Sequence, residues 1–183
     1  VSPCLCVVPM GWNWAMWVAQ RVVYHQALCS KVIPVDRIMC DDRPAPDMSG
    51  GKPALLAYAD NINVIGSDSD SVGKIRDDLV EHFRRVGFVV HEIFGPALDA
   101  VTLGYRVNGR EKLVVPTDRK LEMLRAAGLW LLRRPRVSGK ALERFVGHCT
   151  HLCLLRREMF AIFHHVYAFI TAHATSRCRV WDS

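Results

Sequence analysis

The stretch of residues 55–66 constrains the fold of this chain most strongly. Two apolar, partly β-branched runs, residues 55–57 and 62–66, flank the four residues from Tyr58 to Asn61. Because Asp and Asn tolerate the left-handed conformations of tight turns, the pattern predicts a largely buried β-hairpin. Asp60 would stand at the exposed end of rigid strands, where a carboxylate is well placed to bind a divalent metal. An ordinary hairpin turn explains the same residues, so the choice between a metal site and a simple turn depends on other stretches of the sequence.

Composition limits the class of protein and its partners. Among 183 residues, 50% are hydrophobic and 23% are charged, which is typical of a globular chain with a sizeable core rather than a disordered or membrane protein. The net charge of +6 favours a polyanionic partner such as nucleic acid. The seven cysteines form no CxxC pair, and an odd count without a recognisable secretory signal argues against a disulfide framework, so we expect an intracellular location. Residues 160–174 contain three histidines and are a poor membrane span.

The first third of the chain reads as a strand, a tight turn and a helix. Residues 3–8 are apolar, the turn contains Pro9 and Gly11, and apolar residues then recur at helical spacing from Trp14 to Leu28. Trp12 or Trp14 could present a flat face to a base, or both could belong to the core. Residues 40–53 are rich in Pro, Gly and Asp and predict a loop, in which Asp41 and Asp42 are solvated.

After the central hairpin the pattern predicts one helix and further strands. The helix covers residues 72–86 with a buried stripe, and Gly87 ends it before a strand that begins at residues 88–90. Residues 101–107 and 112–115 flank Asn108 and Gly109, the dipeptide that most strongly indicates a hairpin. The predicted stripe contains Ile75, Leu79, Val80 and Phe83.

From residue 116 onward the composition becomes helical. Thr117 or Asp118 can cap one helix, residues 133–139 form a loop, and another helix starts near Lys140. On that second helix the cysteines share the apolar side with Leu142, Phe145 and Val146, while the histidines lie away from it, which favours buried structural cysteine over zinc binding. The residues compared are His148, Cys149, His151 and Cys153.

The order of these features resembles the second half of a reverse transcriptase of the retrotransposon kind. The turn from Pro9 through Met10 and Gly11 to Trp12 resembles the Pro-x-Gly motif beside the incoming nucleotide. Tyr58 and Asp60 match the Tyr-x-Asp-Asp hairpin, in which Asn61 replaces the second Asp. The hairpin around Leu103 and Gly104 resembles the primer grip, and residues from 116 to about 170 resemble the thumb and connection.

The resemblance implies two-metal phosphoryl transfer with Mg²⁺ or Mn²⁺. Asp60 is then a catalytic metal ligand, and Asn61 offers a neutral carbonyl oxygen at the neighbouring position. The family carries another essential Asp on a strand upstream of the Pro-x-Gly turn, and often a Lys after the helix, where this chain has Phe94. The chain starts without Met. We therefore expect a fragment without the upstream Asp and the fingers, inactive by itself.

We expect an α+β fold, with a partial palm over residues 1–115 and a helical thumb-like region over residues 116–175. The expected partners are an RNA/DNA template–primer duplex and dNTP. Exposed cations would bind the duplex phosphates without reading sequence, although a solvated helix face also explains them. A degenerate, non-catalytic nucleic-acid-binding remnant is one alternative, and a structural helical protein that binds no duplex is another. The cations are Arg133, Arg134, Arg136 and Lys140, with Arg144, Arg156 and Arg157.

Overall fold

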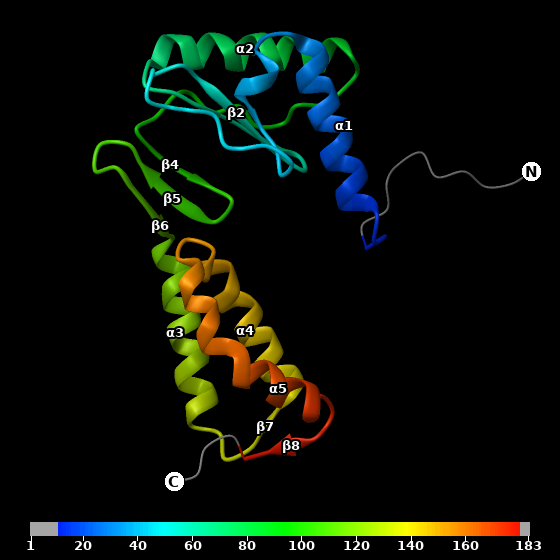
Figure 1. Cartoon of the computed structure of the whole chain (residues 1–183), viewed down its shortest axis with the longest axis vertical. Coiled ribbons are helices and arrows are strands. Elements are labelled where there is room, and N and C mark those ends of the chain that lie inside the picture. The colour runs from blue at the N-terminus through cyan, green and yellow to red at the C-terminus, as the bar shows by residue number, and fades with distance from the viewer. Residues whose placement is uncertain (1–10, 180–183) are drawn as a thin grey trace, which may run out of the picture. The chain divides into compact units, whose positions relative to one another are not determined.

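The computed structural model describes residues 11–179, which fall into two compact units with the division between Ala97 and Leu98. Each unit contains helices and at least one small sheet (Figure 1). The α+β class expected from the sequence is therefore confirmed. The assignment to palm and thumb, with a boundary after residue 115, stays a prediction.

A three-stranded sheet and two helices form the described part of the first unit. Its middle strand is parallel to one neighbour and antiparallel to the other. Leu55 of the middle strand is fully buried and shares a core with Val23 and Ala27 of the first helix and Leu79 and Phe83 of the second. The elements are α1 (Ala15–Ser30), the 3-10 turn η1 (Val35–Arg37), β1 (Ile38–Met39), β2 (Ala54–Tyr58), β3 (Asn61–Ile65) and α2 (Ser69–Arg85).

The central hairpin is confirmed, but its strands are not equally buried. β2 is buried except at Leu56 and at its last residue, whereas the residues of β3 are half-buried or exposed. The reason is the order of the sheet, β1-β2-β3, in which β3 is an edge strand. The prediction that both strands are largely buried is therefore wrong for β3.

Helix α2 begins three residues earlier than predicted because its cap lies further upstream. The Asp68 carboxylate accepts a hydrogen bond from the Ser71 N–H at 2.9 Å, which satisfies one of the free donors at the start of the helix. Gly87 follows the helix with φ +92°, a conformation that glycine adopts without steric cost. Leu79 and Phe83 are buried as predicted, and so is His82.

The loop of residues 40–53 is confirmed, and the buried side chain of Arg37 holds it in place through hydrogen bonds. Arg37 is only 8% exposed, and its guanidinium donates to the carbonyl oxygens of Asp47 (2.6 Å) and Pro53 (3.0 Å) and to that of Lys52. Asp41 and Asp42 are exposed, as expected for solvated carboxylates.

The prediction of a strand that begins at residues 88–90 is wrong. Phe88 packs edge-on against Phe83, with ring centroids 5.2 Å apart, but residues 88–97 have no regular structure. Val89 is 76% exposed. Apolar, β-branched residues favour a strand only where a neighbouring strand accepts their backbone hydrogen bonds, and this segment pairs with none of the described strands.

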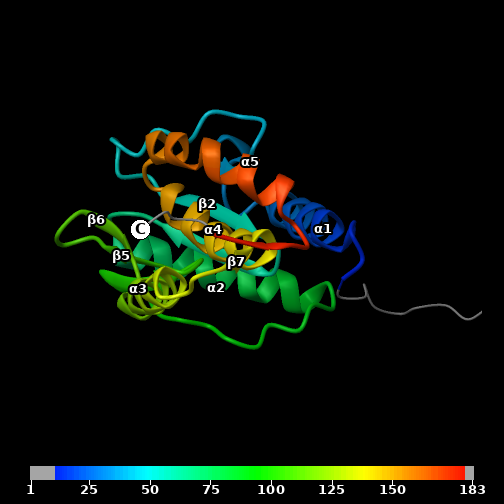
Figure 2. The same cartoon turned by 90° about the horizontal axis from the view of Figure 1, so that it is seen from below.

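The second unit joins a three-stranded antiparallel meander to a group of helices. Helix α4 packs against both α3 and α5, and Figure 2 shows it between them. The two-residue strands of this unit, β7 and β8, pair with each other. The elements are β4 (Asp99–Thr102), β5 (Tyr105–Asn108), β6 (Leu113–Pro116), α3 (Asp118–Leu132), β7 (Val137–Ser138), α4 (Gly139–Cys153), the 3-10 segment η2 (Arg157–Phe163), α5 (His164–Ala172) and β8 (Arg177–Cys178).

The meander corrects the prediction of a single strand over residues 101–107. That stretch contains a two-residue turn, Leu103 and Gly104, between β4 and β5. Asn108 and Gly109 open the next connection, a four-residue loop rather than a tight turn. The Asn108 side-chain oxygen accepts the N–H groups of Arg110 (3.0 Å) and Glu111 (2.9 Å), so the side chain stabilises the wider loop.

Helices α3 and α4 begin where the sequence predicted, and α4 buries the predicted side. Leu142, Val146 and Cys153 are buried in the helical core, while His148 is exposed. Helix α3 buries Leu124 but exposes Leu121, Leu129 and Leu132. Within residues 11–179, none of the helices combines the length and the apolar character that crossing a bilayer requires.

Candidate functional site

The tip of the β2–β3 hairpin is a two-residue turn. Tyr58 pairs with Asn61, so the turn consists of Ala59 and Asp60. Ala59 is the residue with a left-handed conformation, at φ +50°, although the sequence suggested that Asp and Asn would supply it. Ala59 is buried, whereas Tyr58, Asp60 and Asn61 are exposed. The turn therefore directs the carboxylate to solvent.

Asn61 contacts the neighbouring carboxylate. Its Nδ2 donates a hydrogen bond to Asp60 Oδ1 at 3.2 Å. A second carboxylate at this position would repel Asp60, whereas the neutral amide donates a hydrogen bond to it. Mg²⁺ uses one or two protein carboxylates and keeps several waters, so Asp60 fits a single ligand of such an ion. Among the described residues, no three His, Cys, Asp or Glu side chains are grouped closely enough to hold a metal.

Gln20 of α1 bonds the tip on both sides of Tyr58, and the sequence-based prediction did not include it. Its Nε2 donates to the Ala57 carbonyl oxygen at 2.8 Å, and its Oε1 accepts the Ala59 N–H at 2.6 Å. A signal was present, because Gln20 lies at helical spacing with the buried Val23 and Ala27. A polar side chain on a buried stripe requires hydrogen-bond partners.

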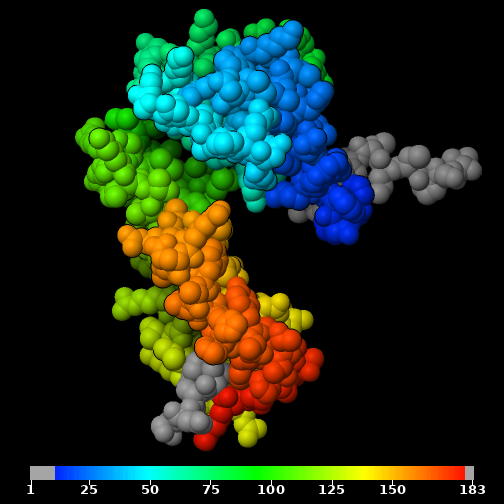
Figure 3. Space-filling model, in the orientation of Figure 1, coloured from blue at the N-terminus to red at the C-terminus, as the bar shows by residue number. Residues whose placement is uncertain are grey.

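Only part of the expected nucleotide-binding turn can be described. Pro9 and Met10 lie outside the described residues, and Gly11 has φ +93°. Trp12 is 47% exposed just before α1, about two helical turns from Gln20. The start of α1, dark blue in Figure 3, projects from the rest of the first unit and also exposes Trp14 and Trp17.

The expected primer-grip turn lies in the second unit beside a cation and an imidazole. Lys120 Nζ occupies the place where a Cβ on Gly104 would stand. The same ammonium lies 3.3 Å from His151 Nδ1, and the His151 ring stacks on Tyr105 with centroids 4.7 Å apart. Burial, together with the Lys120 charge, lowers the pKa of His151 below its ordinary value. The neutral imidazole can accept a hydrogen bond from the ammonium.

The expected phosphate-binding cations gather at the connection between α3 and α4. All four are exposed, and the Arg134 guanidinium lies over the Trp130 ring, 4.3 Å from its centroid. Lys120 and Leu132 are twelve residues apart on α3, about 18 Å along the axis, so these cations and the Leu103 turn lie at opposite ends of the helix. They are Arg133, Arg134, Arg136 and Lys140.

The two units differ in charge as well as in structure. Residues 1–97 contain nine Lys and Arg against eleven Asp and Glu, a net of −2. Residues 98–183 contain fifteen against seven, a net of +8. The basic character of the whole chain therefore comes from the second unit.

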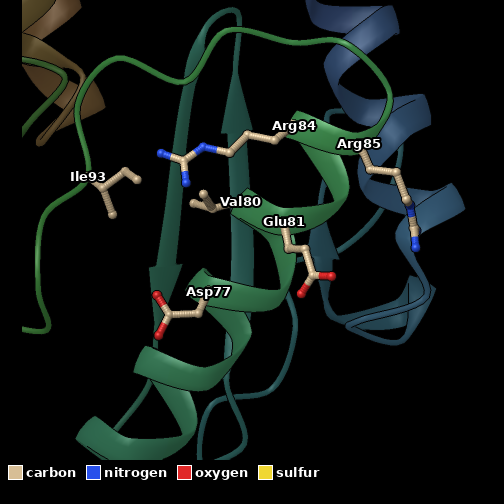
Figure 4. Close-up of a pocket in the computed structure, with 6 residues that line it drawn as sticks. All are labelled: Asp77, Val80, Glu81, Arg84, Arg85 and Ile93. Atoms are coloured by element: carbon tan, nitrogen blue, oxygen red, sulfur yellow. The ribbon is translucent and has the colours of Figure 1, made fainter.

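A shallow hollow of about 540 Å³ lies on the outer side of α2. Figure 4 shows the side chains of Val80 and Arg84 directed toward Ile93, while Arg85 points away from it. Two carboxylates and two guanidinium groups line this surface, so it has no dominant charge. It contains none of the residues predicted to be functional.

The chain is therefore an α+β protein with an exposed carboxylate at the tip of a hairpin whose backbone is hydrogen-bonded by Gln20. Neither a family model, nor a curated protein, nor a solved structure matches the chain.

Proposed function

We propose that this chain is part of a retrotransposon reverse transcriptase, an RNA-directed DNA polymerase in which Asp60 is a metal-ligating carboxylate. The observation that supports the proposal is the exposed carboxylate at the tip of a hairpin whose first strand is buried against α1 and α2. Rigid backbone on both sides limits the directions that the carboxylate can take.

The charge difference between the units supports a division of roles. A metal site requires carboxylates, and a duplex requires cations along its phosphates. The unit with a net charge of −2 contains Asp60, and the unit with a net charge of +8 contains the exposed arginines of the α3–α4 connection. The proposed substrates are dNTP and an RNA/DNA template–primer duplex.

Asp60 would hold Mg²⁺ or Mn²⁺, and Asn61 would orient the carboxylate through its amide donor. The bound ion would supply positive charge that stabilises the reacting phosphate oxygens. With one matched carboxylate, this chain alone is proposed to be inactive, and the parent protein would contribute the further Asp.

The direct test is primer extension by the parent protein containing this chain. We expect Asp60→Ala to reduce dNTP incorporation by at least about 100-fold, since a metal ligand contributes several kcal/mol to the transition state. Asp41→Ala, which removes an exposed carboxylate from the loop, is the matched control and should retain activity. Equal activity of the two variants would contradict the role of Asp60.

A catalytically inactive remnant that binds nucleic acid is the second candidate, and the amide at Asn61 together with the basic second unit favours it. We expect the chain to bind an RNA/DNA duplex with an affinity that falls steeply with salt. Replacing Arg133, Arg134 and Arg136 with Ala should reduce the salt slope by about 1 for each phosphate that is no longer neutralised. The control variant, Lys74→Ala with Arg84→Ala in the first unit, should leave the salt slope of duplex binding unchanged. Absence of binding at low salt would favour a purely structural protein.

A further inference from the structure

The edge of β2 that faces away from β3 loses its strand neighbour just before the hairpin tip. β1 ends at Met39, which is opposite Leu56. Tyr58 pairs with Asn61 across the turn, so its own backbone groups face β3. Neighbouring backbone groups alternate in direction, and the Ala57 carbonyl and the Ala59 N–H therefore point to the other side. Two polar backbone groups beside Tyr58 are left without a strand to bond.

The Gln20 carboxamide takes the place of the missing strand. In a parallel ladder, one residue of a neighbouring strand donates to the carbonyl before its partner residue and accepts from the N–H after it. Gln20 makes this pair of bonds around Tyr58, at 2.8 Å and 2.6 Å. Because a primary amide has both a donor and an acceptor in one plane, it can replace a peptide group here.

The bond to Ala59 falls on the residue whose backbone needs support. Ala59 has φ +50°, a conformation that residues with a Cβ avoid. It is buried at the turn, and Asp60 follows it directly. A side-chain bond to the Ala59 N–H therefore restrains the peptide from which the exposed carboxylate projects.

We propose that Gln20 is a positioning residue, which fixes the direction of the Asp60 carboxylate by completing the sheet edge at the hairpin tip. The importance of that direction rests on the proposed function of Asp60. The restraint itself is a property of the chain and can be tested without a metal or a substrate.

The test is amide hydrogen exchange and backbone relaxation by NMR on the full chain, comparing Gln20→Leu with the wild type. We expect exchange of the Ala59 amide to rise at least about fivefold, because one net hydrogen bond is lost there. The order parameters of Asp60 and Asn61 should fall from about 0.85 to below about 0.6. The Leu55 amide in the middle of β2 should keep its protection.

Gln26→Leu is the matched control. Gln26 is another glutamine of α1, and its Oε1 lies 3.2 Å from the buried His82 Nε2, so the variant loses a bond between α1 and α2 without touching the hairpin. We expect unchanged exchange at Ala59 and unchanged order at Asp60. Equal mobility of the tip in both variants, or in Gln20→Leu and the wild type, would overturn the proposal.

Gln20→Glu provides a second test if Gln20→Leu does not fold. The carboxylate can still accept the Ala59 N–H but cannot donate to Ala57. Ala59 should stay protected and Asp60 should keep its wild-type order, because the bond that restrains the tip is retained, and disorder of Asp60 beside a protected Ala59 would overturn the proposal. Primer extension by the parent decides the role of Asp60 separately, so a restrained tip in an inactive parent refutes only the proposed function.

Discussion

The two tight hairpins within residues 11–179 are held in different ways. The β2–β3 turn has one left-handed residue, Ala59, and a side chain from α1 bonds its backbone. The β4–β5 turn has two consecutive left-handed residues, Leu103 at φ +50° and Gly104 at φ +80°. Two positive φ angles give a turn whose twist matches the flanking strands. The first turn therefore depends on another element, whereas backbone geometry supports the second.

The chemical groups beside the two turns also differ. The first directs a carboxylate to solvent, and that carboxylate accepts a hydrogen bond from the neighbouring Asn61 amide. The second lies against Lys120 and His151. A turn that is hydrogen-bonded by another element can keep an unfavourable residue, Ala59, at its left-handed position and present a side chain on the next residue, Asp60. A turn stabilised by glycine has no side chain to present at that position.

The largest expected effect comes from replacing the glycine on which the second turn depends. Gly104→Ala should destabilise the meander by about 1–2 kcal/mol, because φ +80° is unfavourable for a residue with a Cβ and Lys120 must also move. Exchange of the β4–β6 amides measures the change. Gly109→Ala is the control, since a Cβ there stays 3.4 Å from its nearest neighbour. Equal losses of stability in the two variants would show that the positive φ of Gly104 does not determine the stability of the meander.

A smaller effect is expected when Lys120 is changed to Met. Burial and the Lys120 charge hold the folded-state pKa of His151 below 6.5. The unfolded chain therefore binds this proton more readily, so stability is fully present above pH 6.5 and falls as the pH drops through that value. Without the ammonium, the pKa of His151 should rise toward 6.5, and the loss of stability between about pH 7 and 5 should shrink. NMR titration of the His151 ring measures both proteins, and an unchanged pKa would show that the cation does not act on the imidazole.

The smallest expected effect is that of Ala59→Gly. Relief of the left-handed strain, about 1 kcal/mol, is largely cancelled by the greater backbone freedom of glycine in the unfolded chain. The net change in the free energy of unfolding should stay within about 0.5 kcal/mol. In a double-mutant cycle, Ala59→Gly should stabilise the Gln20→Leu protein more than the wild type, because Gln20 no longer bonds the backbone of the left-handed Ala59. Strict additivity would argue against coupling between Gln20 and the turn.

The sequence predicted elements whose signals are local. The central hairpin, the loop pinned by Arg37 and the helices α1 to α4 follow from apolar spacing, turn residues and caps. The segment of residues 88–90 has a strand-like composition but finds no strand to pair with among the described residues. Asn108 and Gly109 carry the stronger turn signal, yet the Asn108 side chain stabilises a wider loop and leaves the tight turn to Leu103 and Gly104.

The sequence predicts that Asp60 lies at the hairpin tip, but it does not predict the hydrogen bonds that hold the tip. Asp60 follows an apolar run, which is visible in the sequence. Gln20 lies 39 residues before Ala59, and its role emerges only when α1 packs beside the end of β2. Whether Asn61 faces the carboxylate is likewise decided by the turn, which places the two side chains within hydrogen-bond distance.

Residue-by-residue broadening of backbone amide signals by Mn²⁺ shows directly whether the hairpin tip binds a metal ion. If the hairpin tip presents a metal-binding carboxylate, broadening should be strongest at residues 59–61. It should disappear there in Asp60→Asn and persist in Asp41→Asn. Broadening that centres on Asp41 and Asp42, or on Asp77 and Asp78 of α2, and that does not change in Asp60→Asn, would show that the hairpin tip is not a metal site.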